Sequence, residues 1–236
     1  MTEEIFRKDA YAKTCAATVT AIDGRGIQLD RTVFYATGGG QPGDAGTLRL
    51  GDGRSVAIVE ARRDRESGDH LHVPAEGAPR PEVGAAVTAE IDWPRRHRLM
   101  RMHTAMHLLC ALIPQGVTGG AVGEDKGRLD FDLPDTVLDK EQLTAALNRL
   151  IAEDHAVETR WITDAELAAK PDLVRTMSVK PPTGGGRVRL VEIQGVDLQP
   201  CGGTHVARTG EIGRVSIGKI ENKGKHNRRI TLHLED

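Results

Sequence analysis

Two short segments, far apart in the chain, each carry two metal-ligand side chains spaced four residues apart. The first, MRMHTAMHLLCAL at residues 100–112, contains His103 and His107 in an apolar run of helical character. Residues four apart share one face of a helix, so both imidazoles can reach one ion. The second, DLQPCGGTHVART at residues 197–209, contains Cys201 and His205 around a glycine pair that allows a tight backbone. A single site built from both pairs requires a fold that brings the two segments together.

Three imidazoles and a thiolate together favour zinc over other metals. Zn²⁺ takes nitrogen and sulfur ligands in tetrahedral sites, whereas Mg²⁺ and Ca²⁺ prefer oxygen ligands. A lone histidine on an apolar face is more often a packed core residue, so it is the combination of the two pairs that predicts a metal site. Four protein ligands would make a closed, structural site, and three ligands with a water would make a catalytic one. The sequence leaves this choice open.

The neighbours of the candidate ligands narrow the chemistry. A zinc metalloprotease has its general-base glutamate directly after the first histidine, and this chain has Thr104 there. Cys201 could act as a nucleophile with a histidine base, but a thiolate held by zinc is poorly suited to that role. Cys15 lies in a strand pattern and Cys110 in the helical run, so we expect both to be packing residues. No side chain is therefore assigned as catalytic, and a zinc-bound water is the candidate.

The first ninety or so residues have the pattern of a β domain. Alternating apolar and polar residues, separated by glycine turns, predict several short strands. We expect a small β-barrel-like domain at residues 1–92, which includes the glycine-rich segment GGGQPGDAG. Its expected strands cover residues 15–23, 27–34, 47–62 as a hairpin, 70–74 and 85–92.

From Trp93 onward, helical and strand patterns alternate. We expect a helix at residues 99–113, a second helix opened by the cap pair Asp139 and Gln142, and a short helix capped by Thr163 and Glu166. These helices would pack on an antiparallel sheet in an α/β domain at residues 93–236, so the predicted fold class is α+β. The expected strands of this domain cover residues 127–133, 156–162, 187–194, 213–221 and 228–235.

The overall composition excludes several classes of protein. The chain of 236 residues is 39% hydrophobic and 28% charged, as in globular proteins. No run approaches the roughly 18 apolar residues of a membrane-spanning helix, and the first residues, MTEEIFRKDAYAK, lack the apolar stretch of a secretion signal. Three cysteines are too few for a disulfide framework. We therefore expect a cytoplasmic protein without a membrane partner.

Two segments are locally basic although the net charge is −2. That net charge argues against general nucleic-acid coating but permits local patches. A DNA partner is not expected. The first patch is PRRHRLMR at residues 94–101, and the second is GRVSIGKIENKGKHNRR at residues 213–229. Such runs are either solvated faces or nucleic-acid contacts, and composition alone favours solvated faces.

Taken together, these motifs resemble the editing domain of alanyl-tRNA synthetase and the freestanding AlaX proteins. The resemblance rests on HTAMH and CGGTH, on DLQP before the cysteine, and on GEIGRVSIGKIENKGKHNRRI after it. GGGQPGDAG is similar to the glycine-rich segment of the longer AlaX proteins, and VGEDKGRLDFDL to the strand that follows the histidine helix. The match spans nearly the whole chain. Since no region is long enough for an aminoacylation domain, we expect a freestanding trans-editing protein with its zinc-containing editing domain at residues 93–236.

The resemblance implies a hydrolase that cleaves the ester between a wrong amino acid and tRNA(Ala). Its expected substrates are chiefly Ser-tRNA(Ala) and, as a further candidate, Gly-tRNA(Ala). A pocket built for alanine cannot strongly reject glycine or an analogue that adds only a hydroxyl, which is why a second, editing site is needed. The resemblance assigns one Zn²⁺ per chain to His103, His107, Cys201 and His205.

The resemblance also suggests contacts with the substrate. Thr118 is expected to face the seryl hydroxyl, and Gln41 and Asp44 in the glycine-rich segment are further candidates, with a purely structural turn as the alternative. The acceptor end of tRNA(Ala) is the expected partner, and a monomer is favoured. The candidates for phosphate contacts are Arg95, Arg96, Arg98, Lys223, Lys225, Arg228 and Arg229.

Three other functions remain open from the sequence. The chain could be a non-catalytic, zinc-stabilised RNA-binding module, for which a closed ligand set and Thr104 both argue. It could edit a different mischarged tRNA. It could also be a zinc hydrolase of a small ester or amide, although the basic patches count against that.

Overall fold

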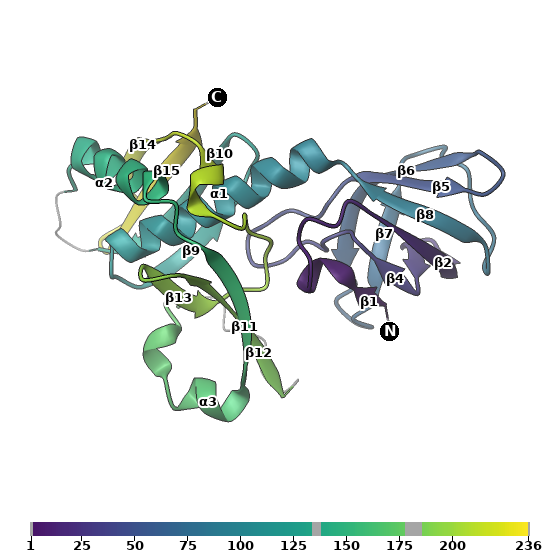
Figure 1. Cartoon of the computed structure of the whole chain (residues 1–236), viewed down its shortest axis with the longest axis horizontal. Helices are drawn as coiled ribbons and strands as arrows, with labels where there is room; N and C mark the ends of the chain where they lie inside the picture. Colours follow the sequence, from purple (N-terminus) through teal and green to yellow (C-terminus); the bar gives the residue numbers. More distant parts are fainter. Residues whose placement is uncertain (1, 134–137, 178–185, 236) are drawn as a thin grey trace. The chain divides into compact units, whose positions relative to one another are not determined.

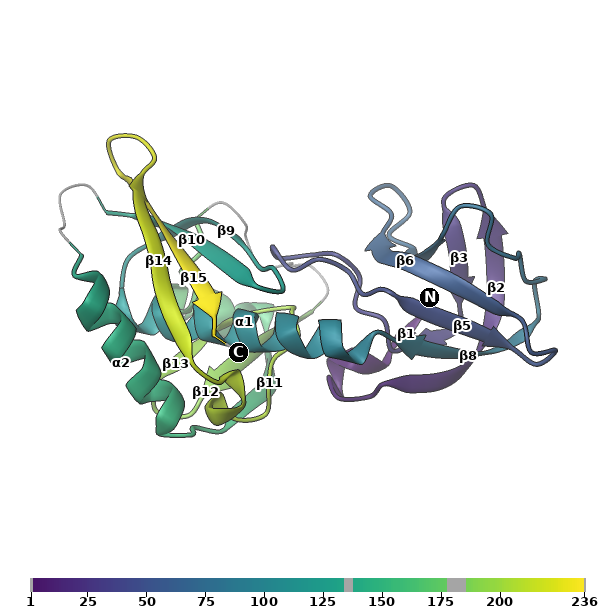
Figure 2. The ribbon, with the colours of Figure 1, turned by 90° about the horizontal axis from the view of Figure 1, so that it is seen from above.

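The computed structural model describes residues 2–133, 138–177 and 186–235 (Figures 1 and 2). The chain divides into two compact units, Met1–His97 and Arg98–Asp236. A closed antiparallel barrel, further antiparallel sheets and helices confirm the predicted α+β class. The domain boundary expected after residue 92 remains a prediction. In the described ranges, no helix combines the length and the apolar character needed to cross a membrane.

The first unit is built around a closed six-stranded barrel. Figure 1 labels most of its strands. Closure leaves the sheet without free edges. In barrel order the strands are β2 (Thr14–Asp23), β3 (Gly26–Leu29), β7 (His70–Pro74), β6 (Ser55–Arg63), β5 (Gly46–Leu50) and β8 (Ala86–Ile91). Before and between them lie β1 (Glu3–Glu4), the 3₁₀ turn η1 (Ile5–Arg7) and β4 (Arg31–Thr32), which pairs in parallel with β1.

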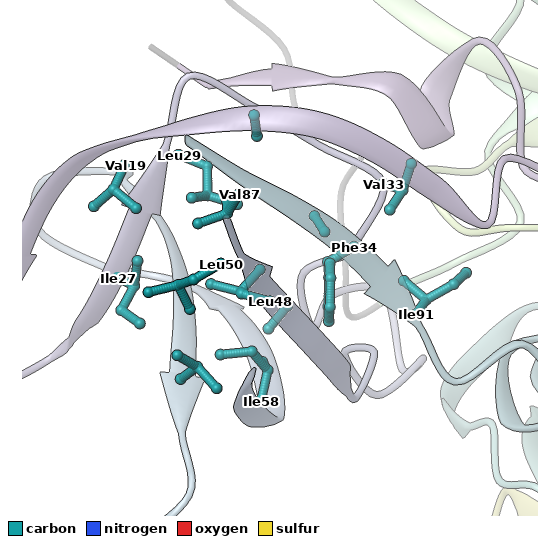
Figure 3. Close-up of a cluster of buried hydrophobic side chains, with 14 residues drawn as sticks. Val19, Ile27, Leu29, Val33, Phe34, Leu48, Leu50, Ile58, Val87 and Ile91 are labelled. Carbon is teal, nitrogen blue, oxygen red and sulfur yellow. The ribbon is translucent and has the colours of Figure 1, made fainter. Parts of the chain in front are cut away.

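Alternation along the strands fills this barrel. In β6, for example, Val56 and Ile58 are buried while Ser55, Ala57 and Val59 are exposed, the two-residue period expected of a strand with one covered face. Figure 3 shows the inward-facing side chains, among them those of Leu48, Ile58 and Val87, meeting in one hydrophobic cluster. The β-barrel-like fold predicted for this part of the chain is therefore confirmed.

The strand expected at residues 27–34 is interrupted, because β3 ends at Leu29. Asp30 is the cause: its Oδ1 accepts hydrogen bonds from the amides of Thr18, at 2.7 Å, and of Arg31, at 2.9 Å. Such a side chain competes with the strand ladder for backbone donors. The residues that follow, Val33 and Phe34, nevertheless pack inside the barrel.

The second unit contains two antiparallel sheets with helices. The four-stranded sheet has the order β14-β15-β10-β9, and the three-stranded sheet has the order β11-β12-β13. The long helix α1 (Trp93–Leu112), labelled in Figure 1, belongs to this unit from Arg98 onward. The strands are β9 (Val117–Ala121), β10 (Lys126–Asp132), β11 (Val157–Thr163), β12 (Arg187–Ile193), β13 (Asp197–Pro200), β14 (Val215–Asn222) and β15 (Asn227–Leu234).

The remaining helices are α2 (Lys140–Ala152), α3 (Asp164–Ala168), η2 (Pro171–Leu173) and η3 (Thr209–Ile212). The predicted caps are confirmed. Asp139 accepts from the amides of Glu141 and Gln142 at the start of α2, and Thr163 with Glu166 forms a capping box at the start of α3.

Helix α1 begins six residues earlier than the predicted start at residue 99. The side chain of Asp92 accepts a hydrogen bond from the amide of Arg95 at 3.1 Å, which caps the first turn, and Pro94 is tolerated in that turn. The basic stretch that follows lacks apolar periodicity, so the pattern could not reveal this start.

Candidate metal centre

The four predicted metal ligands lie together. His103 and His107 come from α1, and Cys201 and His205 from the loop after β13, yet their ligand atoms all lie within 4.8 Å of one another. The Cys201 Sγ is 3.3 Å from His205 Nε2 and 3.6 Å from His103 Nε2. The structure therefore brings together two segments that are remote along the chain.

Helix α1 presents its two histidines from a fully packed interior. The apolar residues around them, among them Met100, Leu108 and Leu109, have no exposed surface. The imidazole rings of His103 and His107 have centroids 5.4 Å apart, as expected of side chains on successive turns of one helix face. Because the helix is held on all sides, the two imidazoles have little freedom to move apart.

A buried arginine shapes the loop that carries the other two ligands. Arg189, on β12, donates from one guanidinium nitrogen to the carbonyls of Cys201, at 2.8 Å, and Gly203, at 2.9 Å. The amide of Cys201 donates in turn to the Arg189 carbonyl, and the amide of Gly203 donates to the cysteine sulfur. These contacts fold the loop tightly, so that Cys201 and His205 point toward α1.

Asp197 and Gln199 on β13 orient His107. The Nδ1 of His107 lies 3.1 Å from Asp197 Oδ2, to which Gln199 also donates at 2.7 Å. Arg175 forms an ion pair with the other oxygen of this buried carboxylate at 3.6 Å. If Nδ1 donates to Asp197, the Nε2 lone pair of His107 is free for a metal ion, an arrangement common around metal-binding histidines.

Thr104 does the same for His205. Its hydroxyl donates to the carbonyl of Met100 at 2.9 Å and lies 3.2 Å from His205 Nδ1. An Nδ1–H that donates to this oxygen leaves Nε2 of His205 facing the sulfur. Thr104, at the position of the metalloprotease glutamate, thus positions a candidate ligand. The sequence did not indicate this positioning role for Thr104, Asp197 or Gln199.

The charges in the cluster suit metal binding. Burial raises the pKa of the Cys201 thiol, but His103, which lies within hydrogen-bond distance of the sulfur, holds that pKa well below its usual value, which favours the thiolate. Burial, reinforced by His103, lowers the pKa of His205 to about 3, so this imidazole is neutral. Burial also disfavours charge on His107, but its hydrogen bonds with Asp197 and Cys201 raise its pKa to about 9. A metal ion would have to displace this proton.

The donor set fits a metal ion. One cysteine sulfur and three imidazoles offer ligand atoms within 4.8 Å of one another, and two of the imidazoles contact Asp197 and Thr104 through Nδ1. This set of soft and borderline ligands is compatible with Zn²⁺ and unsuited to Mg²⁺ or Ca²⁺. The cluster His103, His107, Cys201 and His205 can therefore hold a metal ion.

The glycine-rich segment forms a tight turn in the first unit. Gly38 and Gln41 exchange backbone hydrogen bonds, and Gly39 and Gly40 between them have φ values of +56° and +83°, as a type I′ turn requires. Gln41 is fully buried. This geometry is that of a structural turn, the alternative to substrate contact that the sequence left open for this segment.

Asp44 and Arg96 form a buried ion pair in the same unit. Arg96 Nε lies 2.9 Å from Asp44 Oδ1, and the guanidinium also donates to the carbonyls of Ala10 and Val33. Neither side chain is exposed by more than 1%. The expected roles of Arg96 in phosphate contact and of Asp44 in substrate contact do not fit this burial, because their polar atoms are used inside the protein.

The other predicted contact residues have mixed positions. Arg95 donates to the Gly43 carbonyl, Arg98 pairs with Asp125, and Arg229 is held by Asp130 at 2.7 and 2.8 Å. Thr118, on β9, lies 2.8 Å from Asn227 Oδ1. Lys223 and Lys225 are exposed at the turn between β14 and β15, with Arg228 half-buried at the start of β15 (Figure 2).

The sequence of this chain is similar to those of known proteins. Residues 188–231 match the family model described as threonyl and alanyl tRNA synthetase second additional domain, and residues 3–95 match that of tRNA synthetases class II (A). The alanyl-tRNA editing protein AlaX-M of Methanosarcina mazei is 38% identical, over 100% of this chain and 98% of that protein. This chain belongs to the AlaX-M family.

Other relatives agree with this membership. The AlaX-M protein of Saccharolobus solfataricus is 35% identical over 98% of both chains. An alanine–tRNA ligase of Pyrobaculum neutrophilum is also 35% identical, but its match covers 93% of this chain and only 25% of the ligase. The predicted resemblance to freestanding AlaX proteins is thus confirmed, and AlaX-M membership supports the predicted enzyme class, an aminoacyl-tRNA deacylase.

Proposed function

We propose that this protein is a trans-editing hydrolase that deacylates mischarged tRNA(Ala). Its substrates are chiefly Ser-tRNA(Ala), with Gly-tRNA(Ala) as a further candidate, and its cofactor is one Zn²⁺ per chain. The observation that carries the proposal is the convergence of His103, His107, Cys201 and His205 into one cluster in a member of the AlaX-M family. A cytoplasmic monomer that acts on the tRNA acceptor end completes the proposal.

The roles of the chain's own residues follow from their contacts. Asp197 and Thr104 hold the imidazoles of His107 and His205, and Arg189 holds the loop of Cys201. When bound there, Zn²⁺ supplies a positive centre beside the scissile ester that polarises or orients the reacting groups. Thr118 is proposed to contact the seryl side chain. Lys223, Lys225 and Arg228, with Arg95, Arg98 and Arg229, are proposed to contact phosphates, which positions the tRNA without reading its sequence.

A panel of mischarged tRNAs tests this proposal. We expect serine release from Ser-tRNA(Ala), little release from correctly charged Ala-tRNA(Ala), and loss of release in His103→Ala and Cys201→Ala. Cys15→Ala, which removes a thiol from the barrel, is the matched control and should retain activity. Unchanged deacylation by both site variants, with circular dichroism showing that they are folded, would exclude the cluster as the reaction site.

A second candidate is an RNA-binding module that zinc stabilises without catalysis. It is favoured by the presence of four protein ligand groups, because a closed set leaves no position for water. This candidate predicts tRNA binding without amino-acid release in the same panel.

A further inference from the structure

An exposed tryptophan lies on the strand at the edge of the three-stranded sheet. Trp161, in β11, is 46% exposed, whereas aromatic side chains are usually buried for their large apolar area. Its neighbours Thr159 and Thr163 on the same side of the strand are also exposed. This open aromatic surface is not used by any residue of the metal cluster.

The strand register places Trp161 on the sheet face that carries the metal centre. Trp161 is directly paired with Arg189, and Val191, two residues further along β12, is paired with Gln199. Paired residues of adjacent strands point to the same side of a sheet, as do residues two apart on one strand. Trp161, Arg189 and Gln199 therefore share one face.

Two of these residues connect that face to the candidate ligands. Arg189 donates to the carbonyl of Cys201, and Gln199 donates to the carboxylate that orients His107. Arg189 is thus paired with Trp161 on the neighbouring strand and also contacts the backbone of the candidate ligand Cys201. Arg189 and Gln199 are buried on this face and Trp161 is exposed at its edge, so a molecule that reaches the metal centre across this edge would meet the indole.

A cation accompanies the aromatic ring. Arg187 lies two residues before Arg189 on β12, so it is on the same face, paired with Thr163 and exposed. Within the described ranges Arg187 forms no ion pair. A flat aromatic surface with an exposed guanidinium on the same face suits a single-stranded nucleic acid, whose bases stack and whose phosphates attract cations. An apolar protein partner would not require the cation.

We propose that Trp161 is a stacking platform for a nucleobase of the single-stranded acceptor end of the tRNA, and that Arg187 contacts the adjoining phosphate. The proposal rests on the proposed function, since it assumes that the aminoacyl ester reaches the metal centre. Stacking of this kind is sequence-tolerant, because every base presents an aromatic face. The platform holds the acceptor end while the cluster acts on the ester.

Steady-state kinetics and fluorescence test this proposal in the full-length protein. Trp161→Ala should raise KM for Ser-tRNA(Ala) by about tenfold and leave kcat nearly unchanged, since stacking contributes equally to bound substrate and transition state. Trp161→Phe should restore most of the affinity, because the ring is kept. Val59→Ala, which shortens an exposed side chain on the barrel, is the control and should change neither constant.

Fluorescence gives a readout independent of catalysis. The chain has two tryptophans, so Trp93→Phe leaves Trp161 as the single reporter. A short RNA with a single-stranded CCA end should quench this emission in a saturable manner, whereas a blunt RNA duplex should not. In Arg187→Ala, the quenching should need more RNA and depend less on salt.

The outcomes separate this proposal from the proposed function. Unchanged KM in Trp161→Ala, together with unquenched emission, overturns the platform while Ser-tRNA(Ala) deacylation still supports the editing function. A change in oligomeric state in Trp161→Ala with unchanged KM also overturns it and identifies the face as a contact between copies. Saturable quenching in a protein that deacylates none of the tested tRNAs supports the platform and rejects editing.

Discussion

Single side chains around the cluster hold its candidate ligands in position. Asp197 is buried and accepts from His107, and the nearby imidazole and Gln199 hold its pKa below the usual value despite burial. An ionised carboxylate at this position raises the basicity of His107 and fixes its ring. The centre therefore depends on further residues of these two segments as well as on the four candidate ligands.

Asp197→Asn should weaken metal binding. The amide keeps the size of the side chain but removes the charge that orients His107, so we expect metal affinity to fall about 10–100-fold. Competition with a chromophoric chelator measures this change. Asp52→Asn, on an exposed turn of the barrel, is the control. An unchanged affinity in Asp197→Asn would show that the carboxylate has no part in the centre.

Arg96 is predicted to be structural. Replacing it with methionine leaves the Asp44 carboxylate buried without its partner, which should cost about 3–5 kcal/mol of the free energy of unfolding. Arg54→Met, which breaks an exposed and solvent-screened pair with Asp52, should change the free energy of unfolding much less. Urea unfolding monitored by circular dichroism compares the two variants, and equal losses would contradict the structural role.

At the scale of residues, the sequence predicted those parts of the site whose members lie close together along the chain. The four candidate ligands were predictable because two imidazoles one helical turn apart and a CxxxH loop are local patterns. The partner of Arg96 was not, since Asp44 lies 52 residues earlier and only the fold brings the two charges together. The sequence showed only that Thr104 stands where a metalloprotease has a glutamate. Its contact with His205 appears only in the structure.

At the scale of elements, β1 is tied to the barrel by one carboxylate. Glu4 contacts His70 at 3.0 Å and pairs with Arg7 and Arg63. Burial alone would raise the pKa of Glu4, but the hydrogen bond with His70 and the two cations lower it from 4.5 to about 2. The ionised carboxylate therefore stabilises the folded state.

This pKa predicts a stability that depends on pH. Because the folded pKa lies below the unfolded one, the contribution of Glu4 is complete above pH 4.5 and is lost as the pH falls toward about 2. The stability difference between the wild type and Glu4→Gln should shrink across that window. Urea unfolding at several pH values measures it, with Glu66→Gln at an exposed loop position as the control. A difference that is constant with pH would refute the coupling.

The β14–β15 hairpin offers the clearest test of tRNA contact. Lys223 and Lys225 are exposed beside Gly224, whose φ of +105° makes the tight turn. Replacing both lysines with alanine should weaken tRNA binding and reduce the slope of log affinity against log salt by about 2, one for each lost phosphate contact. Lys8→Ala on the first unit is the control. An unchanged slope would place the hairpin outside the binding surface.

Element boundaries were predictable where the pattern was periodic. Most strands of the barrel alternate regularly and were expected close to their observed limits, and the cap residues predicted the starts of α2 and α3. The start of α1 was missed because its first turn is basic and contains a proline, and β3 was overextended because Asp30 interrupts the ladder. In both cases a side chain–backbone contact decided the outcome.

At the scale of the whole molecule, the chain combines a closed barrel with a unit built of two sheets and a long helix. Family membership follows from matches over the full chain, and it agrees with the motifs that linked HTAMH to CGGTH. The fold class was accessible from the sequence because strands dominate the first part and helices enter after Trp93. The ligand types of the two motifs predicted that they converge, but only the folded structure shows that they do.

The most direct test of the whole account is serine release from Ser-tRNA(Ala) before and after metal removal. Zn²⁺ should be present at one per chain, deacylation should be lost on treatment with a strong chelator, and one equivalent of Zn²⁺ should restore it. Deacylation that continues at the same rate in the metal-free protein, with the fold intact, would contradict the role assigned to the cluster of His103, His107, Cys201 and His205.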